Sequence, residues 1–144
     1  MKKEKTALIA LCVLLGSVLT FAGCSSGPPV IPEDLSVLQF FQRAQEETEN
    51  REWGNALYYY KTFIDRNQDD LPNIAAARYE IAFIQYKQKD YESAAKDFQE
   101  LLDFYETTEL PLSFPLWPKV LSRKVMQTMR DRGFLPEETP PPEG

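Results

Sequence analysis

A twelve-residue pattern that occurs twice constrains the fold of this chain more than any other feature. Residues 53–64 (WGNALYYYKTFI) and 91–102 (YESAAKDFQELL) align without a gap at an offset of 38 residues, with Ala56 opposite Ala94. Each block follows a stretch with helical spacing, so each unit predicts two helices joined by a turn. Such hairpins stack on one another because none can bury its apolar face alone. We therefore predict an all-α fold of antiparallel helix hairpins.

The second unit, residues 77–105 (ARYEIAFIQYKQKDYESAAKDFQELLDFY), resembles a tetratricopeptide repeat. The small-residue positions of that family let two helices approach closely, and here they fall on Ala44, Ala56, Ala82 and Ala94. The resemblance implies a short array of two repeats, although the offset of 38 residues exceeds the usual spacing of about 34. The alternative is an unrelated array of helix hairpins that shares only generic amphipathic spacing.

A further helix is expected after the repeats, because Pro118 can occupy a first helical turn and Gly133 can end a helix. Apolar residues recur every four positions, at Trp117, Leu121, Val125 and Met129, and would form one face of this helix. A repeat array needs such a cap, since its last repeat leaves an apolar face open. We predict a repeat domain with this capping helix over residues 35–132, followed by a disordered tail, rich in proline and glutamate, over residues 133–144.

The first residues predict a targeting segment rather than part of the fold. Lys2, Lys3 and Lys5 precede an uncharged, mostly apolar stretch over residues 6–23 that ends in small residues. This is the pattern of a signal peptide over residues 1–23 that is removed from the mature protein. The alternative is a retained transmembrane helix, because about 18 uncharged residues are close to the length that spans a bilayer.

Cys24 follows this stretch directly, in the order Phe-Ala-Gly-Cys. These four residues resemble the lipobox of bacterial lipoproteins, and the resemblance implies cleavage of the signal before Cys24 and attachment of lipid to its thiol. Ser25 at the next position resembles lipoproteins that are delivered to the outer membrane, which implies an anchor on its periplasmic face. Residues 24–34 are small and rich in proline, and they predict a flexible tether.

The composition argues against several classes of function. The 144 residues include no histidine and 2 cysteines, so the commonest general base and the commonest zinc ligand are absent. We predict no enzymatic activity, no metal, no cofactor and no small-molecule substrate. Removing residues 1–23 takes away three lysines and one glutamate and leaves 13 Lys+Arg against 21 Asp+Glu, a net charge of −8. Such an acidic chain is not expected to bind nucleic acid through its phosphates.

Aromatic residues on the first helix of each unit indicate protein–protein interaction. In tetratricopeptide arrays these helices line a concave face that holds peptides, and the resemblance places Phe41, Tyr79, Phe83 and Tyr86 there. The last three recur at helical spacing, and tyrosine provides a large contact area at low entropic cost. The alternative is that these rings are core residues, packed under the fifth helix or the tether.

The predicted fifth helix differs in charge from the repeats. Residues 33–109 hold 8 Lys+Arg and 17 Asp+Glu, whereas residues 116–132 hold five basic residues and one acidic residue. Lys119, Arg123 and Arg130 fall within roughly 40° of one another on a helix. We predict a basic strip that docks on an acidic partner surface or on anionic headgroups. The alternative is intramolecular, with the strip complementing the acidic body of the same chain.

The order of lipobox, short tether and repeats resembles the BamD family, which are lipoproteins of the outer-membrane β-barrel assembly machinery. Members of that family usually have five repeats, whereas two are found here. The resemblance implies a scaffold that is lipid-anchored to the outer membrane and binds protein partners, among them a β-barrel assembly protein. The alternatives are a repeat lipoprotein that serves cell-wall or pilus assembly and a purely structural envelope lipoprotein.

Overall fold

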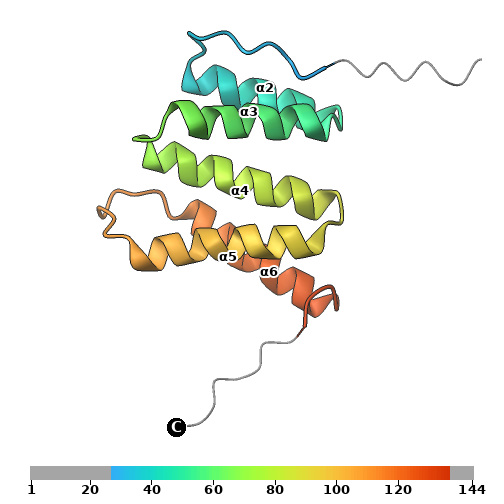
Figure 1. The fold of residues 1–144 in the computed structure, drawn as a ribbon. Coiled ribbons are helices and arrows are strands. Elements are labelled where there is room, and N and C mark those ends of the chain that lie inside the picture. The colour runs from blue at the N-terminus through green and yellow to red at the C-terminus, as the bar shows by residue number, and fades with distance from the viewer. Residues whose placement is uncertain (1–26, 137–144) are drawn as a thin grey trace, which may run out of the picture.

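The computed structural model describes residues 27–136, and over this range it contains five α-helices and no strand (Figure 1). The helices are α2 (Val37–Glu49), α3 (Trp53–Arg66), α4 (Leu71–Lys87), α5 (Tyr91–Thr107) and α6 (Trp117–Asp131). The predicted all-α fold of antiparallel helix hairpins is confirmed. The predicted signal peptide, Cys24 and residues 137–144 lie outside the described residues.

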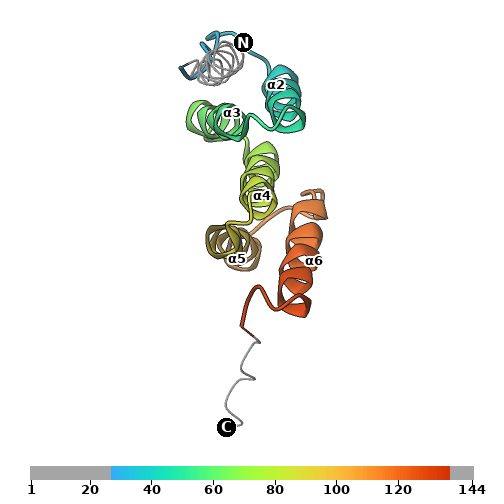
Figure 2. The ribbon, with the colours of Figure 1, turned by 90° about the vertical axis from the view of Figure 1, so that its right-hand side faces the viewer.

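The five helices form two rows, which are visible end-on in Figure 2. Helices α2, α4 and α6 lie on one side, and α3 and α5 lie on the other. Helix α2 pairs with α3 and α4 pairs with α5, while α3 also contacts α4 and α5 also contacts α6. Helix α6 therefore lies where the first helix of a third unit would lie.

The two hairpins are repeats of one another in their backbone hydrogen bonds as well as in sequence. Each turn contains one residue in the left-handed region, Arg51 (φ 62°) in the first and Lys89 (φ 67°) in the second, 38 positions apart. The amide after that residue donates to the carbonyl five residues earlier, at 2.9 Å in the first turn and 3.0 Å in the second. This is the hydrogen bonding of a Schellman motif, which ends both first helices in the same way.

Alanine lies at the seam of each hairpin, where the sequence predicts it. The residues Ala44, Ala56, Ala82 and Ala94 have no exposed surface. The first pair belongs to an apolar cluster built by α2, α3 and α4, and the second pair belongs to a cluster built by α4, α5 and α6. The absence of longer side chains at these positions lets the paired helices approach closely.

Helix α4 is buried on two sides, because it separates the two apolar clusters. Its buried residues in the cluster with α2 and α3 are Ile74, Ala77, Ile81 and Ile84. Its buried residues in the cluster with α5 and α6 are Ala75, Tyr79 and Ala82. A helix with apolar residues on most of its circumference is expected at the centre of an array, where it has neighbours on both sides.

The packed domain begins before residue 35, the start that the sequence predicts. Ile31 is 8% exposed and belongs to the cluster of α2 and α3. The guanidinium of Arg66 donates to the carbonyl of Pro32 at 2.8 Å and to that of Ile31 at 3.4 Å. The last residues of the predicted tether are therefore docked on the domain.

The packed domain also extends beyond Arg132, into residues that the sequence assigns to the disordered tail. Gly133 ends α6 with a φ of 71°, a conformation that glycine adopts without strain. The ring of Phe134 then stacks on that of Tyr91 with centroids 4.1 Å apart. Leu135 packs against the cluster of α5 and α6. Aromatic stacking thus fixes the chain after α6 to the start of α5.

Helix α6 covers α5 with a face that differs from the predicted one. Its buried residues are Pro118, Ser122, Met126 and Met129. The predicted apolar stripe shares only Met129 with this set, since Leu121 and Val125 are partly buried and Trp117 is 43% exposed. Ser122 can occupy the seam because its hydroxyl donates to the carbonyl of Pro118 at 2.7 Å. On the outer side Lys124, Gln127 and Asp131 are exposed together with Val120, so the array ends in a mostly polar face, as a cap requires.

Candidate functional site

A groove runs across the row of first helices and is the candidate binding site. It has a volume of about 470 Å³ and receives residues from α2, α3, α4 and α6 and from the first hairpin turn. We call it the central groove. It is lined by Gln45, Thr48, Glu49, Arg51, Trp53, Tyr79, Glu80, Phe83, Lys87, Trp117 and Leu121.

Aromatic rings form one wall of the central groove. The ring of Tyr79 lies 5.8 Å from that of Phe83 in a stacked arrangement and 5.4 Å from that of Trp117 in an edge-to-face arrangement. Phe83 in turn stacks on Tyr86 at 5.9 Å. These spacings lie in the range at which aromatic pairs attract each other. The wall joins α4 to the start of α6, so the two helices are held together where the groove is lined.

The charged residues of the central groove come in both signs. Glu49 and Arg51 are exposed near the first hairpin turn, Lys87 is exposed at the end of α4, and Glu80 is partly buried in the middle of α4. The ammonium of Lys87 lies 5.3 Å from the centre of the Phe83 ring. Burial raises the pKa of the Glu80 carboxyl, and the positive charge of Lys87 partly offsets that effect.

Two tyrosine hydroxyls next to Glu80 remain protonated at neutral pH. Burial, and to a lesser degree the charge of Glu80, raises the pKa of Tyr79 to about 12. The same two causes raise the pKa of Tyr60 further, while Gln45 lies near enough to lower it slightly. Tyr60 is 1% exposed, and its hydroxyl meets no hydrogen-bond partner in good geometry within residues 27–136. The groove lining therefore contains a carboxyl group beside the neutral hydroxyl of Tyr79, and Tyr60 lies buried behind it.

The aromatic residues predicted from the sequence take three different positions. Tyr79 and Phe83 line the central groove, but Tyr79 is only 7% exposed and belongs to the apolar cluster of α5 and α6. Tyr86 is partly buried and lies beside Phe83, outside the groove lining. Phe41 lies apart from them, because its ring packs edge-on against Tyr60 and Phe63 at 5.4 Å each. The rings of Phe41 and Tyr79 therefore pack with the apolar clusters. Such packing is the alternative to a role in partner binding.

The three basic residues predicted as a strip lie along the seam between α5 and α6. A guanidinium nitrogen of Arg123 is 3.1 Å from a carboxylate oxygen of Glu106 on α5, with both side chains more than half exposed. The ammonium of Lys119 lies 5.9 Å from the centre of the Tyr105 ring. Arg130 lines a shallow hollow of about 340 Å³ together with Arg123. Lys119 and Arg123 thus contact α5, which is the intramolecular arrangement, and an exposed ion pair of this kind adds less than about 1 kcal/mol of stability.

The groove also includes residues that the sequence did not indicate. The apolar pattern predicts Trp117 and Leu121 on the capping face, and neither Trp53 nor Glu80 belongs to a predicted site. The signal that could have found them is the helix order: a fifth helix after two hairpins continues the row of first helices, so its start must face α4. Both tryptophans of the chain line the groove.

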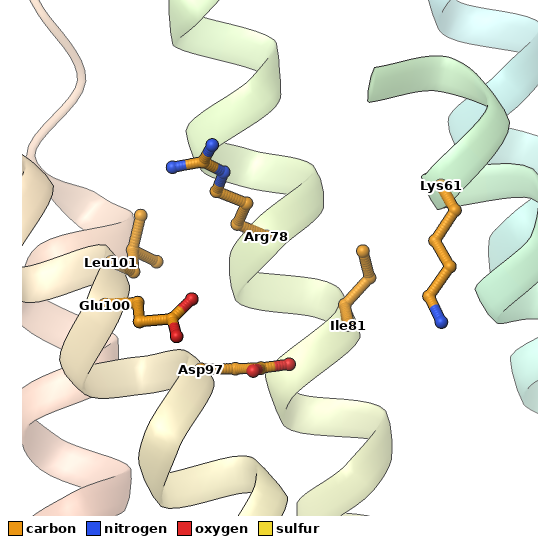
Figure 3. A pocket seen from close by; sticks show the side chains of 6 residues that line it. All are labelled: Lys61, Arg78, Ile81, Asp97, Glu100 and Leu101. Atoms are coloured by element: carbon orange, nitrogen blue, oxygen red, sulfur yellow. The ribbon is translucent and has the colours of Figure 1, made fainter. Parts of the chain in front are cut away.

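A second hollow lies on the other side of α4, between α3 and α5 (Figure 3). It measures about 260 Å³ and is lined by Lys61, Arg78, Ile81, Asp97, Glu100 and Leu101. Figure 3 shows the guanidinium of Arg78 directed away from Lys61 and Asp97. That guanidinium lies over the Phe104 ring at 5.7 Å, and Asp97 accepts a hydrogen bond from Gln85 at 2.8 Å. These side chains are engaged with the fold, and the hollow is not a candidate site.

Two further features of residues 27–136 bear on function. In that range no three residues of His, Cys, Asp or Glu come together in a way that could hold a metal ion. The helices of the same range include none that is both long enough and apolar enough to cross a membrane.

The fold and its groove define a small all-α array of helix hairpins with a concave, aromatic-lined face. An uncharacterized protein of Treponema pallidum (strain Nichols) is 33% identical to this chain over an alignment of 97 residues that covers 65% of the chain. The chain spans 38% of the length of that relative. No protein-family profile matches the chain, and no solved structure matches it.

Proposed function

We propose that this chain is a membrane-anchored scaffold lipoprotein whose central groove binds an extended segment of a protein partner. The observation that carries the proposal is the lining of the groove. Tyr79, Phe83 and Trp117 offer apolar surface, and charged residues of both signs lie beside them. Large aromatic side chains flanked by polar groups are the composition of protein-binding sites. No nucleophile–base pair lies among the groove residues, which supports binding rather than catalysis.

Membership of the tetratricopeptide-repeat class is part of the same proposal. It is supported by the buried alanines at both seams and by the matching turn hydrogen bonds 38 residues apart. It is also supported by the place of α6, which closes the array with a polar outer face. On this basis we propose a periplasmic scaffold anchored to the outer membrane, with β-barrel protein assembly as its specific role.

The groove can be tested with a photo-crosslinking amino acid at one of two matched positions on α2. Glu49 and Glu46 are both exposed glutamates of this helix, but only Glu49 lines the groove. We expect a cross-linked partner from position 49 in intact cells and little or none from position 46. Mass spectrometry of the product then identifies the role: a β-barrel assembly protein supports the specific proposal, and cell-wall synthases or pilus subunits support its alternatives. Equal cross-linking from both positions would contradict the proposal that the groove is the binding site.

The anchor can be tested by substituting each of the two cysteines. We expect Cys24→Ala to abolish incorporation of an alkyne-labelled fatty acid, because the thiol of Cys24 is the proposed attachment point. Cys12→Ala is the matched control, since Cys12 lies within the predicted signal peptide and its substitution should leave labelling unchanged. A wild-type protein that carries no label and has the mass of the uncleaved chain would show a retained transmembrane helix instead.

A further inference from the structure

Glu80 has no hydrogen-bond or salt-bridge partner for its carboxylate among residues 27–136. It lies in the middle of α4, is partly buried and lines the central groove. Lys87 interacts with it only over a longer distance. A charged group that is partly removed from water is costly unless it is paired. Water still reaches the carboxylate oxygens, because they are not among the fully buried unpaired atoms of residues 27–136. The groove therefore offers an acceptor to a donor that enters it.

The hydroxyl of Tyr60 lies near Glu80, but it is enclosed and Tyr60 is not part of the groove lining. Tyr60 is 1% exposed, and its hydroxyl makes no hydrogen bond in the described part of the chain. It lies beside Gln45 and Glu80, which line the groove from α2 and from α4. Buried polar groups are nearly always paired, and exceptions are found at functional sites. The enclosed Tyr60 hydroxyl can donate as well as accept, so it does not decide which ligand fits. The accessible carboxylate of Glu80 can only accept when it is charged, so a ligand group that pairs with it is a donor.

The rings around Glu80 favour a donor that is positively charged. Tyr79, Phe83 and Trp117 line the groove together with Glu80, and aromatic faces attract cations. The structure contains one such contact already, because the ammonium of Lys87 lies 5.3 Å from the centre of the Phe83 ring. The groove lining holds two carboxylates, Glu49 and Glu80, and two cations, Arg51 and Lys87. Arg51 and Lys87 are exposed, and Glu80 is the partly buried carboxylate among the rings.

We propose that the central groove binds an arginine or lysine side chain of the partner segment, with Glu80 as its counter-charge. A guanidinium has five N–H donors and an ammonium has three, so either can bond to the Glu80 carboxylate. The aromatic rings then cover the aliphatic part of the same side chain. This inference rests on the proposed function, because it names the chemistry that the protein-binding groove recognises.

The two tryptophans provide the measurement. Both line the groove and the chain has 2, so their fluorescence reports on this site. The full-length protein in mild detergent is titrated with an end-blocked nonapeptide of alanine and serine whose only charged residue is a central arginine. The matched peptide has citrulline in that place, which keeps the shape of arginine but removes its charge. We expect the citrulline peptide to bind about tenfold more weakly, as the loss of a charge-assisted hydrogen bond implies.

Two variants test whether Glu80 is the counter-charge of the bound arginine. Glu80→Gln keeps the shape of the side chain and should reduce the preference for the arginine peptide to less than about twofold. Glu46→Gln, on the same surface but outside the groove, should leave the preference unchanged. The citrulline comparison on the wild-type protein holds even if a variant folds poorly. Equal binding of the two peptides, or an unchanged preference in Glu80→Gln, would overturn the cation site but leave a protein-binding groove. No binding of either peptide, together with no cross-link from position 49, would overturn both proposals.

Discussion

An Ala94→Glu variant is expected to lose most of the stability of the domain. Ala94 has no exposed surface and belongs to the cluster in which α4 and α5 meet. A glutamate there must either remain charged without a partner or force the two helices apart. An unpaired buried charge costs at least about 3 kcal/mol, against a total stability of about 5–15 kcal/mol for a typical domain. We expect the midpoint of thermal unfolding to fall by more than about 10 °C.

Lys96→Glu on the same helix is the matched control. Lys96 is well exposed, and its ion pair with Glu100 spans 3.8 Å on the surface. Introducing the same side chain there should cost less than about 1 kcal/mol. Circular dichroism during heating measures both variants. A melt of Ala94→Glu that matches the melt of Lys96→Glu would mean that residue 94 faces water, which would invalidate the repeat register.

The seams between the helices could be predicted from the sequence because one physical requirement determines them. Two helices of a hairpin approach closely only where their side chains are small, and the chain has alanine at matching positions in both units. Ala44 and Ala56 are buried in one seam, and Ala82 and Ala94 are buried in the other. The turns could not be predicted in the same detail, because Arg51 and Lys89 adopt the left-handed conformation that glycine usually provides.

The orientation of α6 could not be predicted, because its apolar residues do not define a single face. Leu121 and Val125 suggest one face, whereas Met126 and Met129 suggest a neighbouring one. The choice between them depends on Ser122, whose hydroxyl is satisfied by the carbonyl of Pro118 at 2.7 Å and can therefore be buried. A hydrophobic pattern treats serine as a surface residue. The place of Trp117 in the central groove follows from this rotation, so the apolar pattern of the helix alone does not indicate it.

The sign of a charge also does not show whether a helix faces a partner or its own chain. The sequence predicts a basic strip on α6 and an acidic repeat body, and either contact is possible on those grounds. The structure places Arg123 against Glu106 at 3.1 Å, which is a contact within the chain. Glu80 is the opposite case, because it is one acidic residue among 17 in residues 33–109. Only the arrangement of α2, α4 and α6 shows that it lies on a groove floor without a partner.

A Tyr79→Ala variant is expected to destabilise the domain as a core substitution does. The Tyr79 ring is 7% exposed and contacts three neighbouring rings: Phe83 at 5.8 Å, Phe98 at 5.8 Å and Trp117 at 5.4 Å. Removing an aromatic side chain from such a position leaves a cavity and typically costs about 3–5 kcal/mol. Trp117 loses its partner at the same time, so we expect its fluorescence to change as α6 loosens from α4.

Two controls separate the packing of Tyr79 from a role in binding. Tyr79→Phe removes only a hydroxyl that makes no hydrogen bond within residues 27–136, so its stability should stay close to that of the wild type. Tyr58→Ala removes a ring that is 40% exposed on α3 and should cost less than about 1 kcal/mol.

Urea denaturation compares the three variants. If Tyr79→Ala unfolds at the wild-type midpoint but no longer binds the arginine peptide, then the ring is a contact surface for the partner and not part of the core. If it unfolds early, as we expect, Tyr79 supports the groove from beneath, and binding must be probed at Glu80 instead.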